Sequence, residues 1–200
     1  QTSPQQPGLT QLPFLLEIGS EEIPARFIPS AMADFERLFR AELELAHLQV
    51  AGLHVMATPR RMVLMAEGLD VRQPDRSLEI KGPPVSVAFG ADGAPTPAGL
   101  GFAKKTGLAL EACERSADQR GEFLVARITE PGRPATEVLA EIVPRVVLGV
   151  PFRKTMRWGE HDLEYARPLQ WILMLLGENV VPVQVGYLHA GSVTRGHRTL

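Results

Sequence analysis

Repeated changes in apolar periodicity constrain the fold of this chain more than any other feature. The compact apolar run Phe14–Ile18 is typical of a strand. Apolar residues then recur at three- or four-residue steps from Met32 to Leu43, which is the spacing of an amphipathic helix. Two strand-like runs follow over Leu53–Ala57 and Arg61–Glu67. Helix and strand patterns mixed in this way predict an α+β fold.

The second half of the chain continues this mixture. Thr96 and Pro97 resemble an N-cap and a first helical residue, and the helix that they open should end near Gly107. Pro144 is expected to kink or split a later helix, because proline lacks a backbone N–H and clashes with the preceding turn. We also expect a strand over Glu122–Thr129, and the later helix is expected over Ala135–Leu148. Leu169–Leu176 and Val180–Tyr187 should form a hairpin.

A break in composition divides the chain. Residues 70–84 carry three prolines, mixed charge and little periodicity, which is typical of a boundary between domains. We therefore expect two small lobes, each built of mixed or antiparallel strands packed with helices. The predicted division is a flexible leader over 1–11, an N-terminal α+β lobe over 12–70, a linker over 71–84, and a second α+β lobe with a basic and aromatic C-terminal segment over 85–200.

Composition excludes several classes of protein. The 21 Lys and Arg residues against 23 Asp and Glu residues give a net charge of −2, so any basic surface must be local. The single cysteine, Cys113, cannot form an intramolecular disulfide, which favours a reducing cytoplasm and an inert thiol. The histidines lack zinc-type spacing, so no metal site is expected. No apolar run approaches the ~20 residues of a membrane span.

The last quarter of the chain sets cations beside aromatic residues. Its three motifs are PFRKTMRWG, YARPLQW and TRGHR. In the first motif three cations lie within five residues, and they repel one another unless they meet an anionic partner. In the third, Gly196 lets the chain turn sharply and could bring Arg195, His197 and Arg198 toward one ligand. These segments predict a surface that binds phosphates and stacks planar groups.

Four other motifs have structural explanations beside the functional ones. The glycine-rich stretch Gly90–Gly101 contains neither GxGxxG nor GxxxxGK[ST], so it predicts a loop and a helix entry. Glu21 and Glu22 could act as a general acid and base, but adjacent side chains diverge, and charge at a helix N-terminus is the simpler explanation. The cations of TPRRM and KGPP could hold a phosphate, although solvated loop charge explains them equally well.

An ordered set of motifs carries a resemblance that extends from Leu15 to Arg198. The motifs are LLEIGSEEIPA, TPRRM, KGPP, AFGADGAPTPAGLGFAKKTG, PFRKTMRWG, ARPLQWI and TRGHR. Together they resemble the beta subunit of the heterotetrameric bacterial glycyl-tRNA synthetase. The departures are mild: Ser20 and Ile23 stand where threonine and leucine are expected, and Arg153 stands where proline is frequent.

The resemblance implies an N-terminal portion of a longer, non-catalytic subunit of glycine–tRNA ligase. It places ATP, magnesium and glycine in a separate alpha subunit, so no catalytic residue, cofactor or metal is expected in this segment. The implied partners are the alpha subunit, in an alpha2beta2 complex, and tRNA(Gly), with neither DNA nor a membrane. The implied role is to support glycylation of tRNA in the cytoplasm by positioning tRNA, by assembly with the alpha subunit, or by both.

The sequence leaves the choice between these roles open. An assembly module without tRNA contact explains the arginine and tryptophan content as well, since both residues are enriched in protein interfaces. An editing hydrolase ranks third, because a small active site already rejects amino acids larger than glycine and the sequence offers no nucleophile–base pair. The candidate tRNA-binding residues are Arg60, Arg61, Lys81, Lys104, Lys105, Arg153, Lys154, Arg157, Trp158, Arg195, His197 and Arg198.

Overall fold

The computed structural model describes residues 10–90, 93–118, 121–152, 155–158 and 161–196, and gives the backbone alone for 118, 157–158 and 161–164. Helices and strands are mixed throughout, which confirms the predicted α+β class. The chain forms two compact units. The first joins Gln1–Pro74 to Arg133–Leu200, and the second is Asp75–Gly132.

The first unit is organised around a large sheet. Among the described residues this sheet has eight strands in the order β12-β13-β10-β1-β4-β2, with β11 beside β10 and β3 beside β4. β10 pairs in parallel with β13, and the other pairings are antiparallel. The strands of the sheet are β1 (Gln11–Ser20), β2 (Val50–Ala51), β3 (His54–Thr58), β4 (Arg61–Asp70), β10 (Leu169–Leu176), β11 (Asn179–Val180), β12 (Gln184–Val185) and β13 (Leu188–Gly191).

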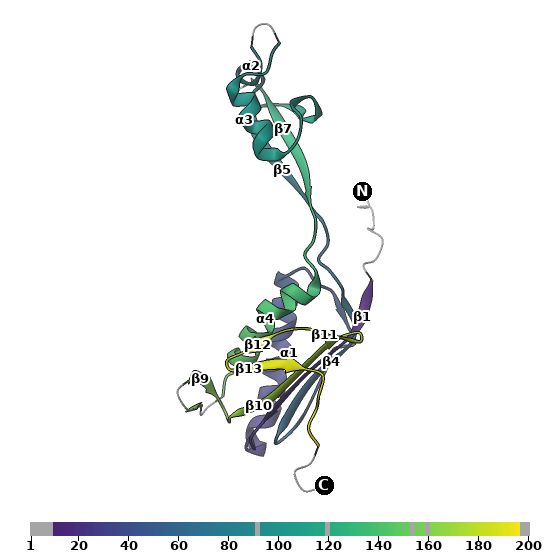
Figure 1. Cartoon of the computed structure of the whole chain (residues 1–200), viewed down its shortest axis with the longest axis vertical. Helices are drawn as coiled ribbons and strands as arrows, with labels where there is room; N and C mark the ends of the chain where they lie inside the picture. The colour runs from purple at the N-terminus through teal and green to yellow at the C-terminus, as the bar shows by residue number, and fades with distance from the viewer. Residues whose placement is uncertain (1–9, 91–92, 119–120, 153–154, 159–160, 197–200) are drawn as a thin grey trace. The chain divides into compact units, whose positions relative to one another are not determined.

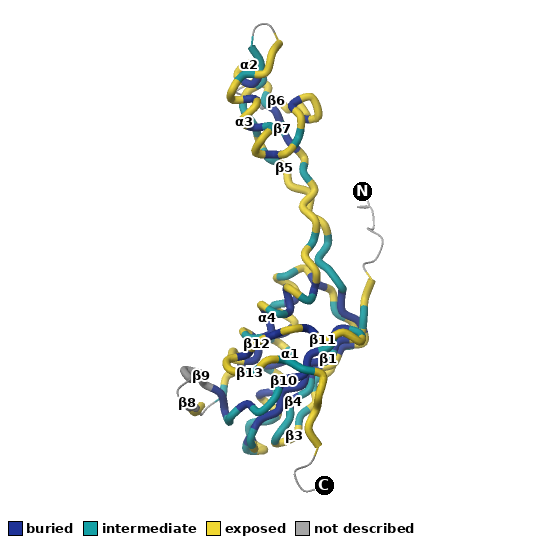
Figure 2. The backbone as a smooth tube through the Cα atoms, viewed as in Figure 1, coloured by how far each residue is buried: buried dark blue, intermediate teal, exposed yellow. Residues whose placement is uncertain are grey.

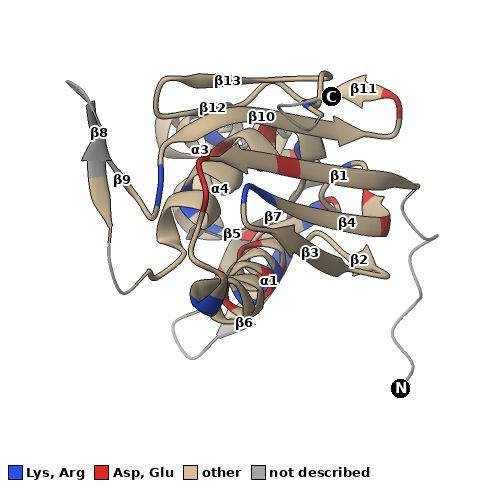
Figure 3. Cartoon of the chain, turned by 90° about the horizontal axis from the view of Figure 1, so that it is seen from below, with Lys and Arg blue, Asp and Glu red and all other residues tan. Residues whose placement is uncertain are grey.

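Two helices cover one face of this sheet. They are α1 (Ile28–Leu45), which follows the short 3-10 helix η1 (Ala25–Phe27), and α4 (Ala135–Gly149). In Figures 1 and 3 both helices lie on the same side of β1, β4 and β10. Their buried residues lie in one apolar core with the strands, and the rings of Phe14 and Phe39 stack with centroids 5.4 Å apart. Figure 2 shows buried residues along the central strands and at intervals along the helices.

The strand register separates the two faces of the sheet. Phe14, Leu16 and Ile18 of β1 are buried toward the helices, so the alternate residues Leu15, Glu17 and Gly19 point to the opposite face. We call this second side the open face. Its rows run across β10, β1, β4 and β3 as Leu175-Leu15-Met65-His54, Leu173-Glu17-Val63-Met56 and Trp171-Gly19-Arg61-Thr58.

A two-stranded ribbon also belongs to the first unit. β8 (Met156–Trp158) pairs antiparallel with β9 (His161–Tyr165). At its end Tyr165 is buried, and Phe152 packs edge-on against its ring with centroids 4.9 Å apart. The first cationic motif of the last quarter therefore lies partly on a strand.

The second unit is smaller and has its own core. Its antiparallel sheet has the order β5-β7-β6, from Arg76–Pro84, Gly121–Glu130 and Glu114–Asp118. Phe102, Leu110 and Leu124 are among the buried residues that pack its helices against this sheet. Those helices are α2 (Val85–Ala88), α3 (Pro97–Thr106) and the 3-10 helix η2 (Leu110–Ala112).

The caps of α3 confirm the expected start and end of that helix. The Gly99 N–H donates to the Thr96 hydroxyl at 3.3 Å, and Pro97 occupies the first helical position. Gly107 ends the helix with φ of 70°, a left-handed conformation that glycine adopts without steric cost. Local chemistry alone was therefore enough to place both ends.

Two local expectations differ from the structure, and a third is contradicted only in part. Most of the expected linker over 71–84 is strand β5, since Arg76–Lys81 pair with Glu130–Val125 of a segment about fifty residues later. The division of the chain differs accordingly: the second unit is inserted into the first, and the first is completed by residues after 132. Sequence periodicity could not reveal this, because a ladder with a distant strand leaves little local pattern.

The remaining two expectations concern Pro144 and the hairpin. Pro144 lies inside α4 without splitting it, so a split is excluded and a kink at this residue stays a prediction. The hairpin forms only as β10 with the two-residue β11, because Gln184–Val185 leave it to pair with β13. The second expected strand, Val180–Tyr187, is therefore divided, since β11 pairs with β10 and β12 pairs with β13.

Candidate functional site: an arginine and tryptophan pocket

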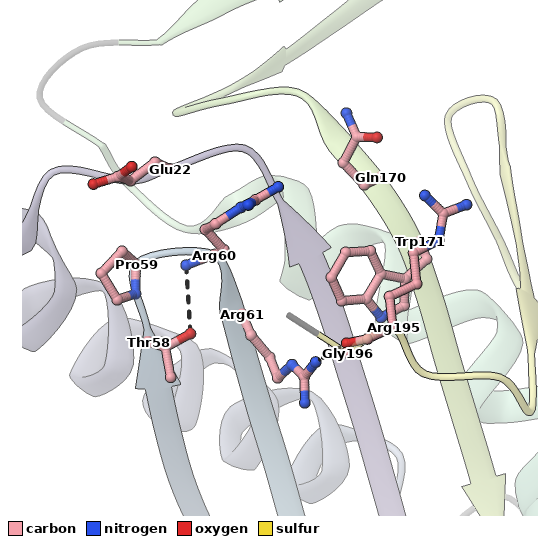
Figure 4. Close-up of a pocket in the computed structure, with 9 residues that line it drawn as sticks. All are labelled: Glu22, Thr58, Pro59, Arg60, Arg61, Gln170, Trp171, Arg195 and Gly196. Carbon is pink, nitrogen blue, oxygen red and sulfur yellow. Dashed lines mark hydrogen bonds between the residues drawn. The ribbon is translucent and has the colours of Figure 1, made fainter. Parts of the chain in front are cut away.

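A pocket of about 550 Å³ lies at one end of the open face (Figure 4). It is formed where the turn between β3 and β4, the start of β10 and the segment after β13 meet. These parts of the chain are far apart in the sequence. The lining residues are Glu22, Thr58, Pro59, Arg60, Arg61, Gln170, Trp171, Arg195 and Gly196. We call this the arginine–tryptophan pocket.

Gly19 gives Trp171 its place in the pocket. The two residues lie opposite each other in the β1–β10 ladder. A Cβ at position 19 would overlap three carbons of the indole ring, so the ring lies directly on the β1 backbone. A glycine inside a strand often marks such a close approach. The indole therefore forms a flat floor on a rigid strand.

Glu17 contacts three of the segments that form the pocket. Its side chain is buried, and its Oε1 accepts hydrogen bonds from Trp171 Nε1 at 2.7 Å and from the Thr194 hydroxyl at 2.5 Å. Arg61 Nε lies 3.6 Å from the same oxygen. Three separate segments thus converge on one carboxylate. Because these donors satisfy its charge, Glu17 orients the pocket residues without being exposed itself.

Two arginines flank the indole ring. The guanidinium carbons of Arg61 and Arg195 each lie 5.7 Å from the ring centroid, within cation–π range. Arg61 also donates to the backbone carbonyl of Arg195. The segment after β13 is therefore held over the sheet by hydrogen bonds through Thr194 and Arg195.

Backbone hydrogen bonds fix the turn that presents Arg60. Ser20 N–H donates to the Arg60 carbonyl at 3.0 Å, and Ile23 N–H donates to the Pro59 carbonyl at 2.6 Å. The Arg60 N–H donates to the Thr58 hydroxyl at 3.4 Å. The Arg60 guanidinium makes a half-exposed ion pair with Glu21 at 3.9 Å. Its backbone is thus rigid, whereas its side chain has only a weak partner in this pair.

The acidic pair has a different position from the one expected. Neither η1 nor α1 has an acidic residue in its first turn. Glu21 instead faces Arg60, and Glu22 lines the arginine–tryptophan pocket. The explanation by helix N-terminal charge is therefore wrong, because the chain runs through Pro24 and η1 before α1 begins.

The structure brings three of the predicted binding residues together: Arg60, Arg61 and Arg195. Lys81, Lys104 and Lys105 belong to the second unit, where Lys81 Nζ lies 3.8 Å from the centroid of the Phe123 ring. Lys104 and Lys105 lie in the last turn of α3. Arg157 and Trp158 lie on β8, and for these two residues only the backbone is described. Arg153, Lys154, His197 and Arg198 lie outside the described residues.

Sequence reasoning missed the residues that organise the pocket. Trp171 lies in the YARPLQW motif but is not among the predicted binding residues, and Glu17 is not among them either. A signal was present, since Gly19 ends an apolar strand in which a larger residue would otherwise be favoured. Its partner could not be identified without the β1–β10 register.

Metal binding, thiol reactivity and membrane spanning find no support in the described part of the chain. No group of three His, Cys, Asp or Glu side chains there could hold a metal ion. Burial raises the pKa of the Cys113 thiol, and the nearby Glu111 carboxylate adds to this, which agrees with an inert thiol. None of the helices described is long and apolar enough to cross a membrane.

Comparison with known proteins identifies similar chains. Residues 14–200 match the family described as glycyl-tRNA synthetase beta subunit. Proteins named glycine–tRNA ligase beta subunit from Trichlorobacter lovleyi and Geobacter metallireducens are each 47% identical over 185 residues. The protein of that name from Syntrophotalea carbinolica is 46% identical over the same length. The aligned region covers 92% of this chain and 27% of each relative, so the chain spans about a quarter of their length.

Proposed function

Because this chain belongs to the glycyl-tRNA synthetase beta subunit family, we propose that it is the N-terminal part of a glycine–tRNA ligase beta subunit and contributes tRNA binding. In this proposal the alpha subunit binds ATP, magnesium and glycine, and this segment supplies no catalytic group. The complex would act in the cytoplasm. The contribution of this segment to glycylation is to hold the tRNA in a productive orientation.

The convergence of Arg60, Arg61 and Arg195 around Trp171 carries the proposal. These side chains come from distant segments but line one pocket. Guanidinium groups bind phosphate through paired N–H donors, and an aromatic face stacks on a base or ribose. The pocket lies on a rigid sheet. A bound phosphate there would be fixed relative to the rest of the unit.

The other predicted cations extend this proposal. Arg153, Lys154, Arg157, His197 and Arg198 flank the pocket-forming segments in sequence and would continue a phosphate track, and Trp158 would stack on a base or ribose beside it. Lys81, Lys104 and Lys105 would form a separate contact on the second unit. Contacts of this kind position the nucleic acid without reading its sequence.

A salt titration tests the role in tRNA binding. Binding of tRNA(Gly) to the chain should weaken linearly on a log–log plot as salt rises, because each neutralised phosphate releases counterions. The double variant Arg60→Ala/Arg195→Ala should bind more weakly and reduce the slope by about one for each phosphate that is no longer neutralised. Arg37→Ala/Arg40→Ala is the control that removes the same charge, since both arginines lie on α1, are exposed and pair with carboxylates of the same helix. An equal slope for both variants would exclude the pocket as the phosphate-binding site.

A second candidate function is assembly with the alpha subunit, and the other end of the open face favours it. Leu15, Met65 and Leu175 line a cavity of about 450 Å³ there, and the neighbouring Met56 side chain is 50% exposed. Exposed apolar patches often mark protein interfaces. Met56→Gln/Met65→Gln should then weaken binding of the isolated alpha subunit and leave the salt slope for tRNA unchanged. The opposite pattern would assign this face to RNA.

A further inference from the structure

We propose that the arginine–tryptophan pocket binds an unpaired nucleotide of RNA, with the base stacked on Trp171 and its phosphate held by Arg60 and Arg195. This inference rests on the proposed tRNA-binding function and narrows it. It specifies single-stranded RNA at this site, whereas tRNA binding alone is equally compatible with the backbone of a duplex.

The indole ring offers a platform for a base. One side of Trp171 lies on the backbone of Gly19, so the ring cannot tilt into the sheet. The guanidinium carbons of Arg61 and Arg195 lie 5.7 Å from its centroid, near the ~6 Å limit of cation–π contacts. Trp171 is only half-buried, so part of its surface stays accessible to a ligand.

The concave shape favours an unpaired base over a duplex. The volume of about 550 Å³ falls in the ~300–1,000 Å³ range of small-ligand pockets. In a duplex the bases are stacked inside the helix, and the phosphates that it presents need an exposed cationic surface, not an aromatic floor. An unstacked base can enter the pocket, and Gln170 at its edge carries an amide that can pair with a base edge.

The three arginines have different roles. Arg61 is engaged by Glu17 and by the Arg195 carbonyl, so it positions the pocket. Arg195 is exposed, and within the described residues its side chain has no carboxylate at ion-pair distance. Arg60 has the half-exposed pair with Glu21 at 3.9 Å. In Figure 4 the side chains of Arg60 and Arg195 extend toward the same side of the pocket as Gln170, where one phosphate could meet both.

Tryptophan fluorescence tests the inference directly. The chain has two tryptophans, so Trp158→Phe leaves Trp171 as the single reporter. We expect a single-stranded hexaribonucleotide to quench this fluorescence and to bind at least about tenfold more tightly than a duplex of the same sequence. Inorganic phosphate should compete weakly. Oligoglutamate serves as a probe for an acidic protein partner and should leave the fluorescence unchanged.

Variants separate stacking from charge, with affinity read by the anisotropy of labelled RNA. Trp171→Ala should weaken binding of the hexaribonucleotide by about 5- to 150-fold, the usual range for loss of a stacked base. Because that variant could unfold, Trp171→Phe and Arg195→Ala are measured beside it. The phenylalanine keeps a ring on Gly19 and should bind several-fold more weakly than the parent chain. Arg195→Ala should also weaken binding and reduce its salt slope.

Each contrary result has a distinct meaning. Equal binding of single strand and duplex without quenching would overturn the unpaired-nucleotide site. If tRNA binding still depended on Arg60 and Arg195 in that case, the proposed function would stand while this inference failed. Quenching by oligoglutamate but not by RNA would assign the pocket to a protein partner. Absence of any tRNA binding would reject the proposed function together with the inference.

Discussion

The two ends of the open face are built from the same three strands but present opposite chemistry. At one end Leu15, Met65 and Leu175 lie side by side and expose an apolar surface. Four residues along each strand, the equivalent row is Gly19, Arg61 and Trp171. The backbone ladders are the same, so the side chains alone make one end apolar and the other a cationic and aromatic pocket.

A single small residue makes this difference possible. In the apolar row Leu15 fills the space above β1, whereas Gly19 leaves that space empty and lets an indole ring occupy it. The row between them contains the buried Glu17, which binds the ring and the segment after β13. A β-sheet can therefore acquire a binding pocket without a change of fold, by pairing a glycine with a large aromatic residue and supporting both with a buried charge.

The largest effect is expected from filling the space above Gly19. Gly19→Ala would place a methyl group inside the position of the Trp171 ring, so the indole must move off β1. We expect a loss of about 1–3 kcal/mol in unfolding free energy, as for other overpacked sites. Urea unfolding measures this loss, and Trp171 fluorescence in the Trp158→Phe background reports the displaced ring.

Gly191→Ala is the control for this change. Gly191 also lies in the sheet, on β13, but the nearest atom to an added Cβ is 3.9 Å away, an ordinary contact. Gly191→Ala should change the unfolding free energy little or raise it slightly, because alanine restricts the conformations of the unfolded chain. If the two variants unfolded at the same urea concentration, the packing of Trp171 on Gly19 would not explain the pocket.

The next effect comes from removing the charge that supports the cationic end. Glu17→Ala leaves Trp171 Nε1, the Thr194 hydroxyl and Arg61 without their shared acceptor, which should cost about 1–3 kcal/mol. RNA affinity should fall as well, because the segment that carries Arg195 loses the hydrogen bond from Thr194 to Glu17. Urea unfolding and anisotropy of labelled RNA measure the two quantities separately.

Leu15→Ala supplies the comparison at the apolar end. Leu15 is half-buried, so its truncation should cost about 1–2 kcal/mol because less apolar surface is buried on folding. Its RNA affinity should stay at the level of the parent chain because the pocket residues keep their partners. If Glu17→Ala and Leu15→Ala reduced RNA binding equally, general destabilisation would explain both results.

The sequence predicted much of the fold because most of its signals are local. The apolar periods gave the strand at β1 and the helices α1 and α4, and Thr96, Pro97 and Gly107 set the ends of α3. Pairing between distant segments is where prediction failed. The strand β5 was read as a linker because its partner β7 begins only at Gly121. The insertion of the second unit into the first follows from that one ladder.

The candidate site was predicted in part for the same reason. Arginines at a turn and beside a glycine are local signals, so Arg60, Arg61 and Arg195 were identified by type. Their meeting around Trp171 depends on the β1–β10 and β1–β4 registers, which no single segment encodes. Glu17 was missed because burial of a charge is visible only once its donors are assembled.

The smallest effect is expected on the helix-covered side of the sheet, where a cation of one helix pairs with a carboxylate of the other. Arg145 of α4 bonds to Glu42 of α1 at 2.6 Å, and this interaction raises the pKa of the guanidinium, so it stays charged throughout the usual pH range. Both side chains are partly exposed, and Arg145→Ala should therefore cost less than about 1 kcal/mol. The measurement is urea unfolding together with the salt slope of RNA binding.

Arg145→Ala removes the same charge as Arg195→Ala but from the opposite side of the sheet. If the arginine–tryptophan pocket binds phosphate directly, only the Arg195 variant should reduce the salt slope, since screening limits long-range effects to about 8 Å at physiological ionic strength. Equal reductions would mean that RNA responds to the net charge of the unit. The two ends of the open face would then differ in packing but not in phosphate binding. The surface that binds RNA would have to be formed by the other predicted cations.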